Sequence, residues 1–275
     1  MDRLDDFRHV FSQMVVARAG SKDPAVLAAF SRVARHEFMG PGPWQVSEHG
    51  DATPSADPAL VYQDIGMGLS GTITTGLPSL HARCMTACAL RPGERVVQVG
   101  AGSGYFTAIL AELVGETGSV VAYEVEPHLA ARAQENLSKQ PNVRVVPASG
   151  VRAFDDAADV IYVFAAVQQL PLSWLESLSP SGRLLFPLTP MNGEGGMLLV
   201  RRTEDSTRFD ARFLCRVRFV PCIGAQDHAM SKQLTAAFAS GGENLVRTLG
   251  LGPTPESGTW LAGDGWWLSA VDAPG

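Results

Sequence analysis

The sequence is poor in charged residues and in cysteine, and it has no long apolar run. Charged side chains make up 18% of the 275 residues, and the formal net charge is -6. Lysine and arginine are scattered along the chain and form no basic cluster that would follow a phosphate backbone. This distribution argues against nucleic acid as a substrate.

No stretch approaches the roughly 18 uninterrupted apolar residues of a membrane-spanning helix. The polar, acidic N-terminus also lacks the apolar core of a secretory signal. We therefore expect a cytoplasmic protein that does not contact a membrane. The sequence does not indicate an oligomeric state.

The four cysteines are too few and too scattered for the disulfide framework of a secreted domain. Cys84 and Cys88 are four residues apart on one face of a predicted helix, which would suit a metal, but no paired His or Cys accompanies them. We expect buried, reduced thiols and no metal site.

Apolar residues make up 45% of the chain, enough for a buried core. Their three- and four-residue spacing predicts helices over Leu4–Arg18 and Pro24–Arg35. The segment Phe38–Asp57 is rich in Gly, Pro, Ser and Asp and is expected to form a long loop. Loops of this length are often lids or covers. The sequence leaves open whether residues 40–57 close over a site.

Beyond Gly93 short β-rich runs alternate with helical stretches. Strands are expected at Arg95–Val99, Ser119–Val125, Val143–Pro147, Val160–Phe164 and Leu184–Leu188, with helices at Tyr105–Val114, Leu129–Ser138 and Leu172–Leu178. This alternation predicts βαβ crossovers and a doubly wound α/β fold with a mainly parallel sheet. Two extended runs, Met197–Arg202 and Arg212–Val220, and a hairpin over Thr259–Ser269 follow it.

A buried strand leads directly into Gly100, Gly102 and Gly104 and then into a helix, an arrangement that lets a ligand approach the backbone and the helix N-terminus. A dinucleotide-binding turn would place its third glycine at Tyr105, so NAD is disfavoured. Glu124 ends the next strand, where a carboxylate can accept both ribose hydroxyls of an adenosine group. The pattern predicts a nucleoside-cofactor site. A plain tight turn with a solvated strand-end charge is the simpler interpretation.

Several segments of the chain match motifs of one enzyme family. Residues 33–38 are similar to a V-P-R-x-x-F segment, and Tyr62–Ala82 is similar to a D-x-x-x-x-I-G-x-x-x-T-I-S-x-P-x-x-x-A stretch. Residues 96–105, 110–115 and 181–187 match further hallmarks. Over about residues 10–200 the chain therefore resembles the protein-L-isoaspartate O-methyltransferase family. The resemblance implies a divergent class I enzyme with a Rossmann-like fold. It also implies methyl transfer from S-adenosyl-L-methionine to a carboxylate of a protein or peptide.

The resemblance further implies which residues bind the cofactor: Gln98, Gly100, Gly102, Ser103, Gly104, Tyr105, Glu124, Ser149 and Gly150. Two of them depart from the usual pattern. Gln98 stands where many methyltransferases have an acidic residue, and it can orient the turn by hydrogen bonds without adding charge. Ser149 replaces the aspartate of the family's G-D-G and would be a weaker partner for the adenine.

In the family a serine or threonine of the T-I-S-x-P segment lies beside the accepting carboxylate, and here Thr74 or Thr75 falls at that place. Two additional residues precede Pro78, so the choice between the threonines is open. Hydroxyls on Thr72, Thr74 or Thr75 would orient the acceptor oxygen, and His81 is near enough in sequence to assist. The simpler interpretation is that the threonines cap the following helix and that His81 is a buried helix residue.

Aromatic side chains near the predicted site have two interpretations each. Tyr62 and Tyr123 would pack on the adenine or line the acceptor cleft, but such residues are more often core. Trp260, Trp266 and Trp267 would seal the sheet, unless an exposed pair binds a peptide.

We expect three segments: an N-terminal helical and acceptor-loop segment (1–90), the cofactor-binding core (91–205) and a β-rich extension packed on the core (206–275). Two other functions stay open beside carboxylate methylation of proteins. In the first, the methyl acceptor is another compound, for example a peptide natural-product precursor or a small acid. In the second, the chain binds the cofactor without catalysis.

Overall fold

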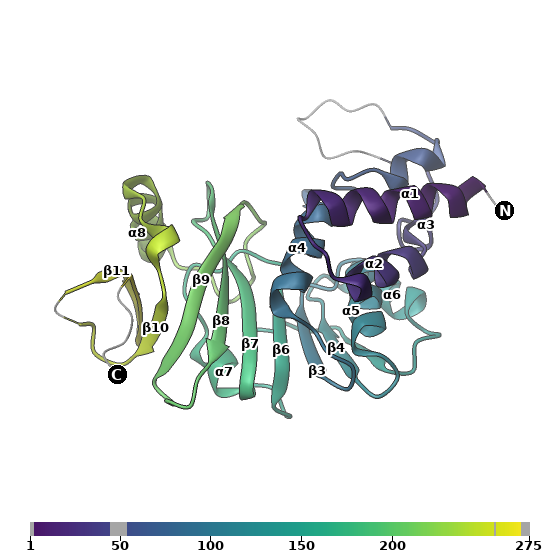
Figure 1. Ribbon diagram of the computed structural model, residues 1–275. Coiled ribbons are helices and arrows are strands. Elements are labelled where there is room, and N and C mark those ends of the chain that lie inside the picture. Colours follow the sequence, from purple (N-terminus) through teal and green to yellow (C-terminus); the bar gives the residue numbers. More distant parts are fainter. Residues whose placement is uncertain (1–2, 45–53, 256, 271–275) are drawn as a thin grey trace. The chain divides into compact units, whose positions relative to one another are not determined.

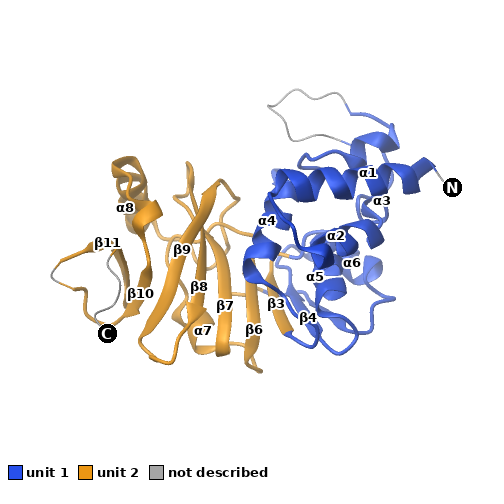
Figure 2. Cartoon of the chain, viewed as in Figure 1, with its two compact units in different colours: residues 1–94, 101–148 blue, residues 95–100, 149–275 orange. Residues whose placement is uncertain are grey.

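The computed structural model describes residues 3–44, 54–255 and 257–270 (Figure 1). The chain forms two compact units, shown in blue and orange in Figure 2. The first comprises residues 1–94 and 101–148, and the second comprises residues 95–100 and 149–275. Residues 45–53 of the predicted loop lie outside the described residues, so its role as a lid stays a prediction. The division into three segments also stays a prediction.

Six α-helices of the first unit are described: α1 (Arg3–Arg18), α2 (Pro24–Arg32), α3 (Arg35–Phe38), α4 (Pro78–Cys88), α5 (Tyr105–Val114) and α6 (Pro127–Asn136), with a 3-10 turn, η1 (Pro58–Tyr62). Asp23 caps α2 by accepting the Ala25 N–H, and Pro24 occupies its first turn. The helix predicted to reach Arg35 ends at Arg32, because Val33 adopts an extended conformation. This break lets α3 begin in a new direction, with Arg35 fully buried.

Two pairs of strands are described in the first unit. Strand β4 (Ser119–Tyr123) pairs in parallel with β5 (Val143–Val146), as the alternation predicts. A short antiparallel hairpin joins β1 (Gly68–Ser70) to β2 (Ile73–Thr74). Its strands are too short to show a periodic pattern, and the sequence did not indicate them. Helix α5 is buried over nearly its whole length and forms the centre of this unit.

The second unit contains a mixed sheet in the order β11-β12-β10-β9-β8-β7-β6-β3. Its strands are β3 (Arg95–Val99), β6 (Ala158–Val163), β7 (Leu178–Leu188), β8 (Gly195–Arg202), β9 (Arg208–Val217), β10 (Thr248–Leu251), β11 (Thr259–Gly263) and β12 (Trp266–Ser269). Strands β3, β6 and β7 are parallel, and the remaining pairings are antiparallel. The α/β fold with parallel core strands is confirmed, and the C-terminal strands make the sheet mixed.

The predicted elements of the second unit differ from the observed ones mainly in length. Helix α7 (Leu172–Glu176) ends before Leu178, where β7 already begins. Helix α8 (His228–Ser240), the turn η2 (Glu243–Leu245) and strand β10 were not predicted. The apolar stripe of α8 is narrow, because only Met230, Leu234 and Phe238 of this helix are buried.

The predicted C-terminal hairpin is confirmed as the antiparallel pair β11 and β12. Trp266 and Trp267 are 1% and 6% exposed, so the structure contains no exposed pair of these tryptophans. Trp260 packs edge-on against Phe213 and Phe238. All three tryptophans are therefore structural. No helix in the described part of the chain is long and apolar enough to cross a membrane.

Candidate active site

The backbone of the glycine turn adopts positive φ angles, which favour glycine. Gly100, Gly102 and Gly104 have φ angles of +89°, +56° and +90°, a region that other residues enter only with strain. A Cβ atom on Gly104 would also lie 2.8 Å from Cδ1 of Leu137. The turn thus brings the chain closely past α6 before α5 begins at Tyr105.

Three hydrogen bonds hold the turn to the rest of the first unit. The Ala101 N–H donates to the Tyr123 carbonyl (3.1 Å), and the Gly102 N–H donates to Oε2 of Glu124 (2.7 Å). The Asn136 amide of α6 donates to the Ser103 carbonyl (2.8 Å). Three successive residues of the turn are therefore held to the end of β4 and to α6.

The Glu124 carboxylate combines burial with unused acceptor capacity. The residue is 7% exposed, Oε2 accepts the Gly102 N–H, and Oε1 accepts the Glu126 N–H (3.0 Å). A carboxylate offers about four acceptor sites, so about half of its capacity is left for a ligand. Together with the N-terminus of α5, which has no side-chain cap, this donor and acceptor set fits the ribose of an adenosine group.

The side chain of Tyr105 points into the core. The residue is 1% exposed, and its ring packs against Phe38 and Phe30 at centroid distances of 5.8 and 6.5 Å. Its hydroxyl has no hydrogen-bond partner among the residues that the structure describes, and burial raises the pKa of Tyr105. Only the backbone of Tyr105, at the start of α5, is placed to take part in ligand binding.

The two tyrosines considered for adenine stacking, Tyr62 and Tyr123, are core residues as well. Tyr62 is 6% exposed and its hydroxyl hydrogen-bonds Nδ1 of His36 (2.6 Å), and Tyr123 is 5% exposed. Their burial favours the structural interpretation over adenine stacking.

Four of the predicted cofactor residues belong to the second unit. Gln98 is fully buried, and its side-chain amide donates to the Gly100 carbonyl (3.2 Å). It therefore orients the start of the turn without charge, as its residue type suggests. The Ser149 hydroxyl accepts the Val151 N–H and donates to the Ile223 carbonyl. The Gly150 carbonyl accepts the indole N–H of Trp174 (2.9 Å).

The two candidate threonines differ in their surroundings. Oγ1 of Thr75 accepts the Met67 N–H (3.0 Å) and an Arg35 N–H (3.3 Å), and it donates to the Gly76 carbonyl (3.1 Å). These three bonds use the whole capacity of a hydroxyl. Thr74 is half-buried, and its hydroxyl makes one long contact, from the Gly76 N–H (3.4 Å). Thr74 is therefore the one with an available hydroxyl.

The helix-capping interpretation of these threonines is wrong. The N-cap residue of α4 is Leu77, and no side-chain cap is present there. Instead, Oδ1 of Asp64 accepts the Ser79 N–H (2.8 Å) in the first turn of α4. Pro78 does occupy that first turn, as predicted.

The threonine hairpin lies beside the glycine turn within the first unit. A Cβ atom on Gly102 would be 3.1 Å from Cδ1 of Leu69 in β1. The His81 ring of α4 stacks on Phe106 of α5 with ring centroids 4.0 Å apart. These contacts bring Thr74, His81 and the turn into one region.

His81 is a buried, neutral histidine. It is 1% exposed, and burial, assisted by the charge of Arg35, lowers its pKa to about 3. A Cβ atom on Gly76, which has a φ of +70°, would lie 2.9 Å from Nε2 of His81. His81 is therefore a buried helix histidine whose ring packs against Gly76, just after strand β2 of the hairpin.

The lowered pKa of His81 predicts a pH-dependent stability. An unfolded histidine has a pKa of about 6.5, so the unfolded chain takes up the proton first as the pH falls. The contribution of neutral His81 to the free energy of unfolding is complete above a pH of about 6.5 and is lost progressively toward pH 3. Denaturant unfolding at pH 7, 6, 5 and 4 gives the free energy of unfolding of the wild type and of a His81→Gln variant. Below pH 6 the wild-type value should fall more steeply with decreasing pH than that of the variant, by up to about 1.4 kcal/mol per pH unit. Parallel curves would contradict a buried neutral imidazole.

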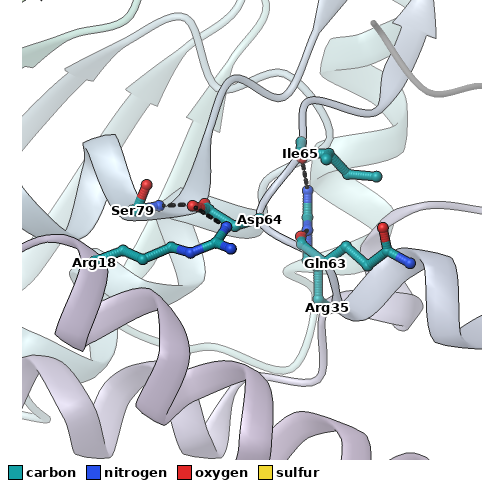
Figure 3. A network of polar contacts seen from close by, with 6 residues as sticks. All are labelled: Arg18, Arg35, Gln63, Asp64, Ile65 and Ser79. Atoms are coloured by element: carbon teal, nitrogen blue, oxygen red, sulfur yellow. Dashed lines mark hydrogen bonds and ion pairs between the residues drawn. The ribbon is translucent and has the colours of Figure 1, made fainter.

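Sequence analysis missed two residues of this region. Arg35 donates to the carbonyls of the segment before the hairpin, and Asp64, within that segment, accepts the Ser79 N–H of α4 (Figure 3). An arginine at the centre of the V-P-R-x-x-F resemblance was the available signal for Arg35. In the described part of the chain no cluster of three His, Cys, Asp or Glu could hold a metal, and Cys84 and Cys88 are buried.

Comparisons with known proteins agree with this arrangement. A family model described as Protein-L-isoaspartate(D-aspartate) O-methyltransferase matches residues 13–227. A Protein-L-isoaspartate O-methyltransferase of Bradyrhizobium sp. (strain ORS 278) is 36% identical over 77% of this chain and 91% of its own length. One from Roseiflexus sp. (strain RS-1) is 31% identical over 82% and 94%.

Solved structures share the fold. A Plasmodium falciparum structure described as a putative protein-L-isoaspartate O-methyltransferase in complex with S-adenosyl-L-homocysteine has a TM-score of 0.63 at 19% identity, covering 78% of this chain and 97% of its own. A second structure with the same enzyme name has a TM-score of 0.66 at 23% identity, covering 84% and 69%. Sequence and fold lead to the same conclusion: the chain belongs to the protein-L-isoaspartate O-methyltransferase family.

Proposed function

We propose that this chain transfers the methyl group of S-adenosyl-L-methionine to the free carboxylate of an isoaspartyl residue in a protein or peptide. Family membership makes it an S-adenosylmethionine-dependent methyltransferase acting on protein carboxylates. The observation that carries the proposal is the contact between the Glu124-anchored glycine turn and the hairpin that presents Thr74. A cytoplasmic location belongs to the same proposal.

Each residue of the site has a role that follows from its contacts. The cofactor supplies an electrophilic methyl group on a sulfonium. Glu124 would accept the ribose hydroxyls with the acceptor capacity that Gly102 and Glu126 leave unused. The backbone of the turn and the start of α5 would hold the remainder of the cofactor.

The acceptor side requires orientation and no general base. A carboxylate is ionised at pH 7 and is already the nucleophile. The Thr74 hydroxyl would donate a hydrogen bond to one carboxylate oxygen and so orient the other for attack on the methyl group. His81, which is neutral and supports Gly76, moves no proton in this scheme.

Replacing Thr74 by valine should lower kcat for an isoaspartyl peptide by about 10-fold or more, because the acceptor loses an orienting hydrogen bond worth about 1.5 kcal/mol. The affinity for S-adenosylhomocysteine should stay within about twofold, since the Thr74 hydroxyl makes no hydrogen bond to the glycine turn in the described structure. A Thr74→Ser variant, which keeps the hydroxyl, is the matched control. Equal activity of the serine and valine variants would remove Thr74 from the acceptor site.

The proposal as a whole is tested by calorimetric titration with S-adenosylhomocysteine and a methyl-transfer assay on an isoaspartyl peptide and its aspartyl counterpart. Micromolar binding and selective methylation of the isoaspartyl peptide are expected. Binding without methylation of either peptide would favour a second candidate, methylation of a different carboxylate. The two additional residues before Pro78 are the specific observation behind that alternative, because they lengthen the segment between Thr74 and α4. Absence of binding would overturn the cofactor site itself.

A further inference from the structure

Arg35 is a fully buried cation at the start of α3. Its guanidinium donates to the carbonyls of Val61 (2.8 Å), Gln63 (2.7 Å) and Ile65 (2.8 Å) and to Oγ1 of Thr75 (3.3 Å). Figure 3 shows this side chain directed at the chain around Gln63 and Ile65. All of its hydrogen-bond partners in the described structure are backbone carbonyls or a hydroxyl, and no carboxylate is among them.

Burying a charge without an ionic partner is costly. Burial lowers the pKa of Arg35 to about 10, so the group is still protonated at neutral pH. The planar guanidinium has five N–H donors in a fixed geometry, and four hydrogen bonds to defined acceptors offset part of the cost. Because the donor directions of the guanidinium are fixed, these hydrogen bonds hold the acceptor atoms in defined positions.

The carbonyl acceptors of Arg35 belong to alternate residues of the chain. Val61 lies in the 3-10 turn η1, and Gln63 and Ile65 lie in the bend that follows it, so the bent backbone directs all three carbonyls at one guanidinium. Asp64, between them, points to the other side, where its carboxylate accepts the Ser79 N–H of α4 (2.8 Å) and pairs with Arg18 (3.2 Å) (Figure 3). The segment is thus held between Arg35 on one side and the start of α4 on the other.

The fourth bond of Arg35 reaches the acceptor hairpin. Thr75 receives the Arg35 N–H and is paired with Met67 in both directions, through its own N–H (2.9 Å) and its hydroxyl (3.0 Å). Thr74 is the next residue. On its other side the guanidinium lies 5.6 Å from the ring of Tyr105, the first residue of α5. One side chain therefore connects the segment before the hairpin, the hairpin base and the helix that follows the glycine turn.

We propose that Arg35 is a positioning residue for methyl transfer, which acts through the 61–65 segment and Thr75 to hold the Thr74 hydroxyl at the acceptor carboxylate. The inference rests on the proposed function and deepens it, since it assigns the alignment of acceptor and donor to a residue that touches neither. The planar fork is essential to this role, so a lysine, with a compact ammonium, cannot replace it.

The test compares Arg35→Lys with Arg32→Lys, the same substitution three residues earlier at a side chain that is 69% exposed. Arg35→Lys should lower kcat for an isoaspartyl peptide by about 10- to 100-fold, because a small misplacement of reacting groups is sufficient for such a loss. The dissociation constant of S-adenosylhomocysteine should change by less than about threefold. Hydrogen exchange should accelerate over residues 61–76 and not over α5. Arg32→Lys should resemble the wild type in all three measurements.

A second pair of variants keeps the test decisive if Arg35→Lys does not fold. Thr75→Val removes the hydroxyl that joins Arg35 to the hairpin, and Thr75→Ser retains it. We expect the valine variant to lose kcat and hairpin protection and the serine variant to recover both. Wild-type kcat in Arg35→Lys, or in Thr75→Val, would overturn the proposal, and so would a loss of cofactor affinity as large as the loss of kcat. A wild-type chain inactive on the isoaspartyl peptide would instead refute the proposed substrate, while hydrogen exchange would still decide whether Arg35 orders the hairpin.

Discussion

Replacement of Glu124 by alanine is expected to weaken the binding of S-adenosylhomocysteine by about 100-fold or more. The carboxylate accepts two backbone N–H groups, from Gly102 and Glu126, and is 7% exposed. Its removal takes the ribose acceptors away and also leaves these two N–H groups without their partner. Hydrogen bonds to a charged group contribute about 1.5–3 kcal/mol each, and about 2.7 kcal/mol corresponds to 100-fold in affinity.

Calorimetric titration of three variants would measure this effect. Glu124→Gln keeps one oxygen acceptor and should lose about 10-fold in affinity, between the wild type and the alanine variant. Glu126→Gln is the control, because its side chain makes no hydrogen bond or ion pair in the described structure and only its N–H contacts the site. An alanine variant that binds within about threefold of the wild type would place the ribose elsewhere.

Replacement of Gly104 by alanine is expected to reduce both stability and cofactor binding. Its φ of +90° is strained for any residue with a side chain, at a cost of about 1–2 kcal/mol. The new Cβ would also lie 2.8 Å from Cδ1 and 3.1 Å from Cγ of Leu137, and overpacking of this kind costs about 1–3 kcal/mol. We expect the free energy of unfolding to fall by about 2–5 kcal/mol and the affinity for S-adenosylhomocysteine to fall by at least about 10-fold, since the turn must move away from α6.

The same helix provides a matched control. Gly115 ends α5 as Gly104 precedes it, with a φ of +65° and no atom within 4 Å of an added Cβ. Gly115 has a ψ of -173°, a conformation that is essentially restricted to glycine, so Gly115→Ala should cost about 1–3 kcal/mol of unfolding free energy and leave cofactor affinity unchanged. Denaturant unfolding and calorimetry on both variants separate the two effects. Equal losses in both variants would mean that backbone strain alone, and not the packing of the turn, accounts for the result.

Local patterns made the fold and the cofactor turn predictable. A strand of β-branched residues, three glycines and a helix follow one another without interruption, and each choice depends on neighbours in sequence. Glu124 is predictable for the same reason, because it ends the next strand. The antiparallel strands β8 to β12 were harder to assign, since their order depends on pairing between distant segments.

The choice between Thr74 and Thr75 lay beyond local patterns. The two residues are adjacent and chemically identical, and they differ in what reaches them through space. Arg35 is 40 residues from Thr75 in sequence and 26 from Val61. Its unexpected position follows from the break after Arg32, which an amphipathic pattern does not reveal.

By itself the sequence determined the α/β fold, the family and the glycine turn with Glu124, because local propensity and short motifs specify each of them. Only the tertiary structure decided which threonine has an available hydroxyl, that His81 is buried and neutral, and that Arg35 organises the hairpin. The physical reason is that burial and hydrogen-bond partners are set by contacts between distant segments. An arginine, a histidine and two threonines have no defined role until packing determines which polar atoms remain available.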